Sequence, residues 1–255
     1  MRHRSFAVGM FTSFVLGFGL YGSVFVFPVF CQNLLGFSAQ QTGELLFPGG
    51  LCTIMMMPFI GKMLNRGIPA QFMATIGMFL FFVFTTMLSG STLGTGEKDV
   101  LIPLLIRGIG MALLFVPLTT LAIADLKGPE LGQGTGLNNM MRQLGGSFGI
   151  AVLTTIIHIR TAKHRSDLLS NINPYNNAFT QRLEMLQQGF IAKGKSAIDA
   201  LHMAYVAIEG AVARQSLLLT YDDAYWISGL VMLFSIPLLY LQPFKKSAKM
   251  PVDAH

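Results

Sequence analysis

Four polar side chains lie close together in an otherwise glycine-rich and apolar stretch between Gly134 and Ile157. They are Asn138, Asn139, Arg142 and Gln143. A guanidinium group and amides can bind the anionic or polar part of a small molecule, or the carbonyls of a neighbouring helix. An arginine that faces lipid is costly, so we expect Arg142 to face a water-filled cavity, to pair with an ion, or to extend to the lipid headgroups.

The spacing of these residues predicts how a helix would present them. One face would hold Asn138, Arg142, Gly145 and Gly149 at i, i+4, i+7 and i+11, with Asn139 and Gln143 on its flank. We interpret this face as the wall of a cavity, because the amides beside Arg142 also need partners. Snorkelling remains the alternative, since Arg142 would lie roughly 12 Å from the inner end of its helix. The glycines four residues apart also favour close packing on another helix.

A second pair of ionisable residues, Glu44 and Arg107, is expected at similar depth near the outer surface of the membrane. We predict an ion pair there that closes the outer side and weakens when the carboxylate accepts a proton. The alternative is that each side chain reaches the interface separately. Gln32, Tyr21 and Phe115 are candidates for an aromatic and polar pocket, with packing against helices or lipid as the alternative for the rings.

The composition places these side chains in a membrane protein. Of 255 residues, 52% are hydrophobic and only 12% are charged. Six apolar stretches are at or near the length of about 20 residues that spans a bilayer. They are Phe6 to Phe30, Leu45 to Leu64, Phe72 to Leu88, Leu101 to Ala124, Gly134 to Ile159 and Tyr225 to Leu241. The sequence therefore predicts an all-α integral membrane protein with six transmembrane helices.

The distribution of basic residues predicts the orientation of these spans. If residue 1 is inside the cell, the inner segments carry Arg2, Arg4, Lys62, Arg66, Lys127, Lys245, Lys246 and Lys249. The two short outer loops carry only Lys98. We therefore expect both termini in the cytoplasm.

The expected organisation has three parts: five spans in residues 1–159, a long outer, periplasmic helical loop in residues 160–223, and a last span with a basic cytoplasmic tail in residues 224–255. The turn cluster Asn171 to Asn177 divides the loop. We favour a solvated helical hairpin that caps the outer mouth. An interfacial helix from Ser196 to Leu219 is the alternative.

Several other kinds of function are not supported. The five histidines and two cysteines lack the spacing of a metal site, and no nucleophile, base and orienting group stand together as in an enzyme. The glycines at 132, 134 and 136 lack the strand and lysine of a phosphate-binding loop. The net charge of +6 belongs to loops around the spans, so nucleic acid is not an expected partner. We expect no enzymatic activity, metal or cofactor.

The stretch from Gly132 to Ala151 resembles a helix of the EmrB/QacA-type drug transporters of the major facilitator superfamily. Matching motifs follow in order along nearly the whole chain: Arg4-Ser-Phe-Ala, Pro28-Val-Phe-Cys-Gln32, Gly43-Glu-Leu-Leu-Phe-Pro48, Arg107-Gly-Ile-Gly, Phe115-Val-Pro-Leu-Thr-Thr120, Asn173-Pro-Tyr-Asn176 and Asp223-Ala. One motif departs from the pattern, because Asn65 precedes Arg66 where the superfamily has an aspartate. Since this family has fourteen spans, the chain resembles its C-terminal six-helix half-bundle.

The resemblance implies multidrug or small-molecule efflux by proton antiport in the cell inner membrane. Its expected partners are the lipid bilayer, protons, and hydrophobic or cationic small molecules. In such transporters the substrate lies between two related halves, so this bundle would need an N-terminal half or a homodimer partner. The chain would then be a fragment, a split-gene product or a half-size transporter. The alternative is a non-transporting membrane scaffold or a degenerate remnant.

Overall fold

The computed structural model describes residues 2–123, 129–170, 172–173 and 175–240, and within these ranges the chain is helical and forms no strand. The helices are α1 (Arg2–Asn33), α2 (Ala39–Asn65), α3 (Ala70–Ser89), α4 (Glu97–Ile123), α5 (Pro129–Leu169), α6 (Asn177–Ala192), α7 (Ala197–Phe234) and α8 (Ile236–Tyr240). Six helical stretches in the described residues are long and apolar enough to cross a membrane. The expected fold class is confirmed.

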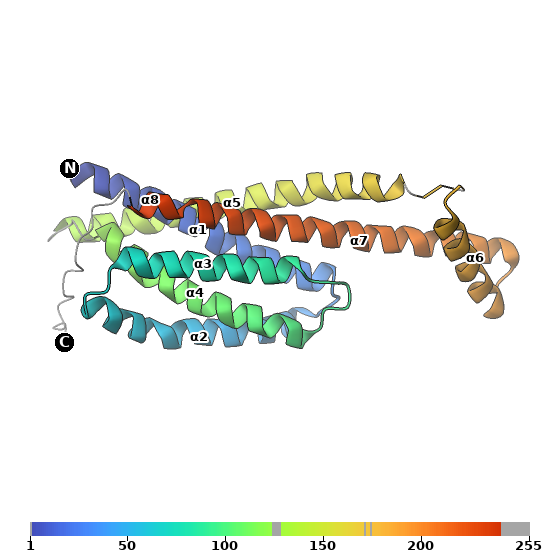
Figure 1. Cartoon of the computed structure of the whole chain (residues 1–255), viewed down its shortest axis with the longest axis horizontal. Coiled ribbons are helices and arrows are strands. Elements are labelled where there is room, and N and C mark those ends of the chain that lie inside the picture. The colour runs from blue at the N-terminus through green and yellow to red at the C-terminus, as the bar shows by residue number, and fades with distance from the viewer. Residues whose placement is uncertain (1, 124–128, 171, 174, 241–255) are drawn as a thin grey trace.

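The helices form a bundle with two ends (Figure 1). We call the end where α1 begins and α2 ends the near end, and the end where α1 ends and α2 begins the far end. α1 packs mainly on α5, α2 packs on α4, and α3 packs on α4 and α7. α5 and α7 continue side by side past the far end, and α6 packs against α7 at the tip of this extension.

The extension differs from the expected boundaries of the long outer loop. α5 continues past residue 159 to Leu169, and α7 runs without a break from Ala197 to Phe234. The helix expected at Ser196–Leu219 and the first part of the last span therefore form one helix, which no proline interrupts, and the span ends in the short helix α8 after Ser235. At about 1.5 Å per residue, the 41 residues of α5 extend for roughly 60 Å, about twice the hydrocarbon thickness of a bilayer.

The same geometry overturns two interpretations of that loop. It does not cap the end of the bundle, because the extension projects away from the far end (Figure 1). The helix expected at the membrane interface continues the axis of the last span instead of lying across it. The expected end of the fourth span at Ala124 and the tail at 241–255 lie outside the described residues.

Local sequence explains where α2 begins and ends. The Ser38 side chain accepts a hydrogen bond from the backbone N–H of Gln41, and the Gln41 side chain accepts one from the backbone N–H of Ser38, which is a capping box. Gly67 follows the helix with a φ of 89°, a left-handed conformation that favours glycine. Prolines inside α1, α2 and α4 are tolerated because neighbouring groups in a membrane bundle satisfy the freed carbonyls.

Glycines allow α1 and α5 to approach backbone to backbone. A Cβ atom at Gly145 would overlap with the carbonyl group of Phe14, and a Cβ atom at Gly17 would overlap with the carbonyl group of Arg142. In the same contact, the Ser13 hydroxyl donates a hydrogen bond to Asn138 Oδ1. Close contact of small residues is a common way for membrane helices to associate, and here it fixes the orientation of α5.

Candidate functional site

Arg142 lies on the flank of α5 that faces α4. Its guanidinium carbon is 4.4 Å from the ring centroid of Phe115, and its Nη2 donates to Asn139 Oδ1 at 2.7 Å. Its Nε and Nη1 atoms are buried, with no hydrogen-bond partner in the described part of the chain. A cation–π contact and one hydrogen bond thus hold the charge in place.

Aromatic and amide groups surround this charge. The Tyr21 ring of α1 lies over Gly146, one turn beyond Arg142, and Tyr21 is 37% exposed. Asn139 is half-buried and Gln143 is exposed. We define the arginine site as Tyr21, Phe115, Asn139, Arg142 and Gln143. Such a set can bind the anionic or polar end of a small molecule while aromatic rings contact its apolar part.

The expected cavity wall is wrong for the rest of that helix face. Asn138 is 2% exposed and accepts its hydrogen bond from Ser13 of α1. Gly145 and Gly149 lie against the backbone of α1 at Phe14 and Phe18. The physical reason is that the glycines let α1 come so close that this face is filled by backbone, which leaves the flank to carry the site.

Gln32 does not join the arginine site. It is exposed in the last turn of α1, eleven residues beyond Tyr21, which is about 16 Å along a helix. The structure therefore separates Gln32 from Tyr21, while Tyr21 and Phe115 lie against neighbouring turns of α5, at Gly146 and Arg142.

Glu44 and Arg107 do not form the expected ion pair in this structure. Glu44 is exposed near the start of α2, where its Oε1 accepts a hydrogen bond from Gln40 Nε2 at 3.0 Å. Arg107 is 9% exposed, and its guanidinium carbon lies 5.6 Å from the ring centroid of Phe84 in α3. Similar depth in the membrane is thus not enough for an ion pair. The Glu44 side chain is directed outward, whereas the Arg107 side chain is directed into the bundle.

A cavity of about 220 Å³ lies where α1, α2 and α4 meet. Val24 of α1, Leu46 and Thr53 of α2, and Leu104 and Arg107 of α4 contribute to its wall. Thr53 Oγ1 donates to the carbonyl of Gly108 at 2.9 Å and so joins α2 to α4 at this cavity. Its mainly apolar wall suits part of a hydrophobic molecule.

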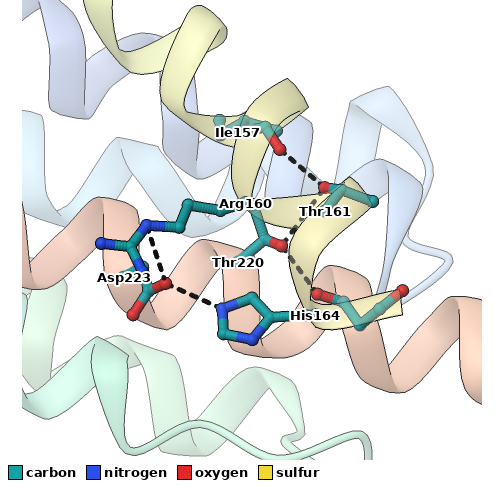
Figure 2. Close-up of polar contacts among 7 residues, drawn as sticks. Ile157, Arg160, Thr161, His164, Thr220 and Asp223 are labelled. Carbon is teal, nitrogen blue, oxygen red and sulfur yellow. Dashed lines mark hydrogen bonds and ion pairs between the residues drawn. The ribbon is translucent and has the colours of Figure 1, made fainter. Parts of the chain in front are cut away.

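A third polar cluster joins α5 to α7 near the far end of the bundle (Figure 2). His164 Nε2 lies 2.8 Å and Arg160 Nε 3.6 Å from the same carboxylate oxygen of Asp223. Thr161 Oγ1 donates to Thr220 Oγ1 at 3.2 Å beside them. These contacts account for basic residues directly after the fifth apolar stretch, since a carboxylate on α7 pairs with them.

Sequence reasoning assigned no structural contact to Ser13, Asp222 or Tyr225. Ser13 carries no sequence signal that points to Asn138, because the two residues are 125 positions apart. Asp222 and Tyr225 share one face of α7 by their i, i+3 spacing, which was a usable signal.

The fold and these sites define a multi-pass membrane protein that holds charged side chains within its spanning bundle. Residues 1–150 match the Major Facilitator Superfamily. The chain belongs to this family of membrane transporters.

Relatives with curated names agree with this assignment. The chain is 28% identical over 89% of its length to the multidrug export protein EmrB of Haemophilus influenzae. It is 26% identical over 94% of its length to the fatty acid resistance protein FarB of Neisseria gonorrhoeae. It is 31% identical over 66% of its length to an uncharacterized MFS-type transporter, YhcA, of Bacillus subtilis. These matches cover 43%, 46% and 31% of the relatives, so the chain spans less than half the length of each.

Proposed function

We propose that this bundle forms one side of the pathway of an exporter of small amphipathic molecules, driven by proton antiport. The observation that carries the proposal is the arginine site. Arg142 is fixed between Phe115 and Asn139, yet two of its nitrogen atoms have no partner in the described part of the chain. A polar group of a substrate would satisfy them.

The chemistry of the site indicates which substrates are favoured. Hydrophobic molecules suit the rings of Tyr21 and Phe115. An anionic or strongly polar group suits Arg142 better than a cation does, because Arg142 already occupies the face of Phe115. The names of two relatives support export, since one is a multidrug export protein and the other a fatty acid resistance protein. Nothing in the described structure gives better support to a non-transporting scaffold or a degenerate remnant.

A complete pathway needs a second bundle. In transporters built from repeats, the substrate site lies at the interface of the repeats. The arginine site and the 220 Å³ cavity are built from α1, α2, α4 and α5. We propose that an N-terminal bundle or a second copy of this chain faces these four helices and forms the other wall.

The protein is proposed to lie in the inner membrane with both termini in the cytoplasm. The excess of lysine and arginine in the expected inner segments supports this orientation. The near end of the bundle would then face the cytoplasm, and the extension of α5 and α7 would project outward.

Dye accumulation in cells that lack their own multidrug exporters tests the proposal. The chain is expressed alone and together with the N-terminal six-helix bundle of a relative, and two dyes with the same apolar part, one anionic and one cationic, are compared. We expect lower accumulation of the anionic dye with at least one of these arrangements. Dissipating the proton gradient should raise the accumulation of the anionic dye to that of cells without the protein.

The matched variants are Arg142→Ala and Arg182→Ala, the second of which removes an exposed arginine from α6. Arg142→Ala is expected to abolish export and Arg182→Ala to leave it unchanged. Equal accumulation in cells with and without the protein, in both arrangements, would refute export as the function.

A further inference from the structure

The cavity between α1, α2 and α4 has a cation in its wall that the arginine site does not use. Arg107 contributes to this wall and is 9% exposed. Its Nε atom is buried without a hydrogen-bond partner among the described residues, and the ion pairs that these residues form do not include Arg107. An arginine stays charged in a protein, and a buried charge without a partner is costly. An anion in the cavity would supply the missing partner.

The rest of the wall is mainly apolar and offers no carboxylate. Its nine residues include no aspartate or glutamate, and Val24 of α1, Leu46 of α2 and Met111 of α4 contribute hydrocarbon side chains. Among these nine, only Thr53 carries a hydroxyl group, which donates to two backbone carbonyls at 3.0 and 2.9 Å. A ligand in this cavity therefore meets one cation and a largely hydrocarbon surface.

Phe84 of α3 supports the guanidinium group without neutralising it. The guanidinium carbon of Arg107 lies 5.6 Å from the centroid of the Phe84 ring, which is the distance of a cation–π contact. An aromatic ring has a quadrupole and no net charge. The charge of Arg107 thus remains for a carboxylate, which guanidinium groups bind through charge-assisted hydrogen bonds.

Glycines make the cavity rigid in one place and open in another. A Cβ atom at Gly108 would overlap with the carbonyl oxygen of Gly49, so α4 and α2 touch through backbone at the wall. Gly50, the next residue of α2, is exposed, and a Cβ atom there would have no neighbour within 4 Å. Gly50 thus borders free space through which a molecule can enter a preformed site.

The cavity is separate from the arginine site. Arg107 and Phe115, the residue that holds Arg142, are eight residues apart on α4, which is roughly 12 Å along a helix. Because α4 begins at the far end of the bundle, Arg107 lies nearer that end than Phe115 does (Figure 1). In the proposed orientation, the cavity is the outer of the two places.

We propose that this cavity is a second ligand site, which binds amphipathic carboxylates. The carboxylate lies on Arg107, and the hydrocarbon part lies against Val24, Leu46 and Met111. A single carboxylate matches the single cation of the wall. A cationic molecule is disfavoured, because its charge would lie beside Arg107 with no acidic side chain in the wall. The inference goes beyond the proposed function, since binding at this cavity requires neither export nor Arg142.

Photolabelling of the purified chain in nanodiscs of zwitterionic phosphatidylcholine tests the site. The probe is decanoate with a diazirine on its chain, and mass spectrometry locates the adducts on peptides of α2 and α4. We expect adducts on residues of the cavity wall that excess decanoate removes and excess decanol does not, because decanol has no charge for Arg107. If decanol competes as well as decanoate, or if decanoate removes no adduct from the wall, the inference is overturned.

Arg107→Gln removes the cation and keeps a polar side chain. It should weaken binding of the probe by about tenfold or more, because a hydrogen bond to a charged group is lost. Arg182→Gln, at an exposed position of α6, is the matched control and should bind the probe as the native chain does. An affinity of Arg107→Gln equal to that of the native chain contradicts the inference.

A second pair of variants tests the cavity if Arg107→Gln does not fold. Gly50→Leu places a side chain in the free space and should abolish the labelling that decanoate displaces. Gly43→Leu adds the same side chain two turns earlier on α2, at an exposed glycine that also has no neighbour within 4 Å, and should leave the labelling unchanged. Full labelling of Gly50→Leu would show that the probe binds elsewhere.

An anionic lipid could offer the same chemistry through its headgroup. Replacing part of the phosphatidylcholine by phosphatidylglycerol should therefore leave the affinity for the probe unchanged, and displacement of the probe by this lipid overturns the inference. The result is independent of the transport assay, because labelling needs no second bundle and no proton gradient. Displaceable labelling that Arg107→Gln weakens supports the second site even if export fails, and its absence overturns the site even if export is observed.

Discussion

Replacing Gly145 by alanine tests the contact on which the arginine site depends. The added methyl group would overlap with the carbonyl of Phe14, a backbone atom that cannot rotate away as a flexible side chain does. The backbones of α1 and α5 would have to move apart. Overpacking of this kind typically costs about 1–3 kcal/mol, and we expect about 3 kcal/mol here because the obstacle is main chain.

Gly136 in the same helix is the matched control. It is exposed, and a Cβ atom there would have no neighbour within 4 Å. Alanine is a better helix former than glycine, so Gly136→Ala should stabilise α5 by up to about 1 kcal/mol. The two substitutions add the same methyl group to the same helix and should differ by about 4 kcal/mol, the sum of the two effects.

Unfolding of the purified chain in mixed micelles by increasing fractions of SDS measures both variants. The midpoint of Gly145→Ala should fall well below that of the native chain, and the midpoint of Gly136→Ala should equal or exceed it. Gly17→Ala, on the α1 side of the contact, should cost little more once Gly145→Ala has separated the helices. If Gly145→Ala and Gly136→Ala unfold at the same fraction of SDS, the backbones of α1 and α5 are not in contact, and the reasoning is refuted.

Three further changes test other contacts. Ser13→Ala leaves a buried asparagine oxygen without its donor and should destabilise the protein by about 1–3 kcal/mol in the same unfolding assay; an unchanged midpoint would contradict the hydrogen bond. Asp223→Asn should speed amide exchange in residues 160–169 and cost about 1 kcal/mol or less because the pairs are partly exposed, while Glu184→Gln on α6 should have no effect. Tyr175→Cys, at a position that is 95% exposed, should react with a membrane-impermeant maleimide in spheroplasts. Arg66→Cys should react only after lysis. The reverse pattern would invert the proposed topology.

The spans could be predicted from the sequence because each is a long apolar stretch, but the full lengths of α5 and α7 could not. Near the far end of the bundle and in the extension, these helices are held by pairs such as Arg165 with Glu209, at 2.7 Å, and His164 with Asp223, whose members lie 44 and 59 positions apart. No local pattern announces such pairs. A charged stretch after an apolar one therefore looks like the start of a loop, although the helix continues.

The arginine site could be predicted in part for a similar reason. Helical periodicity correctly groups residues on one face, but it does not say whether that face meets water, lipid or another helix. The glycines at 145 and 149 carried that information, since small residues four apart favour helix contact. By this rule Asn138, on the glycine face, belongs to the interface with α1, and Gln143 stays on the free flank.

The two arginines differ in the helices that surround them. Arg142 lies on the flank of α5 against Phe115 of α4, whereas Arg107 lies against Phe84 of α3 and lines the cavity between α1, α2 and α4. α1 contributes to both regions, through Tyr21 at the first and Val24 at the second. A displacement of α1 relative to α5 would therefore change the surroundings of both arginines together. The glycine contact between α1 and α5 restricts that displacement to sliding or rocking without separation of the helices.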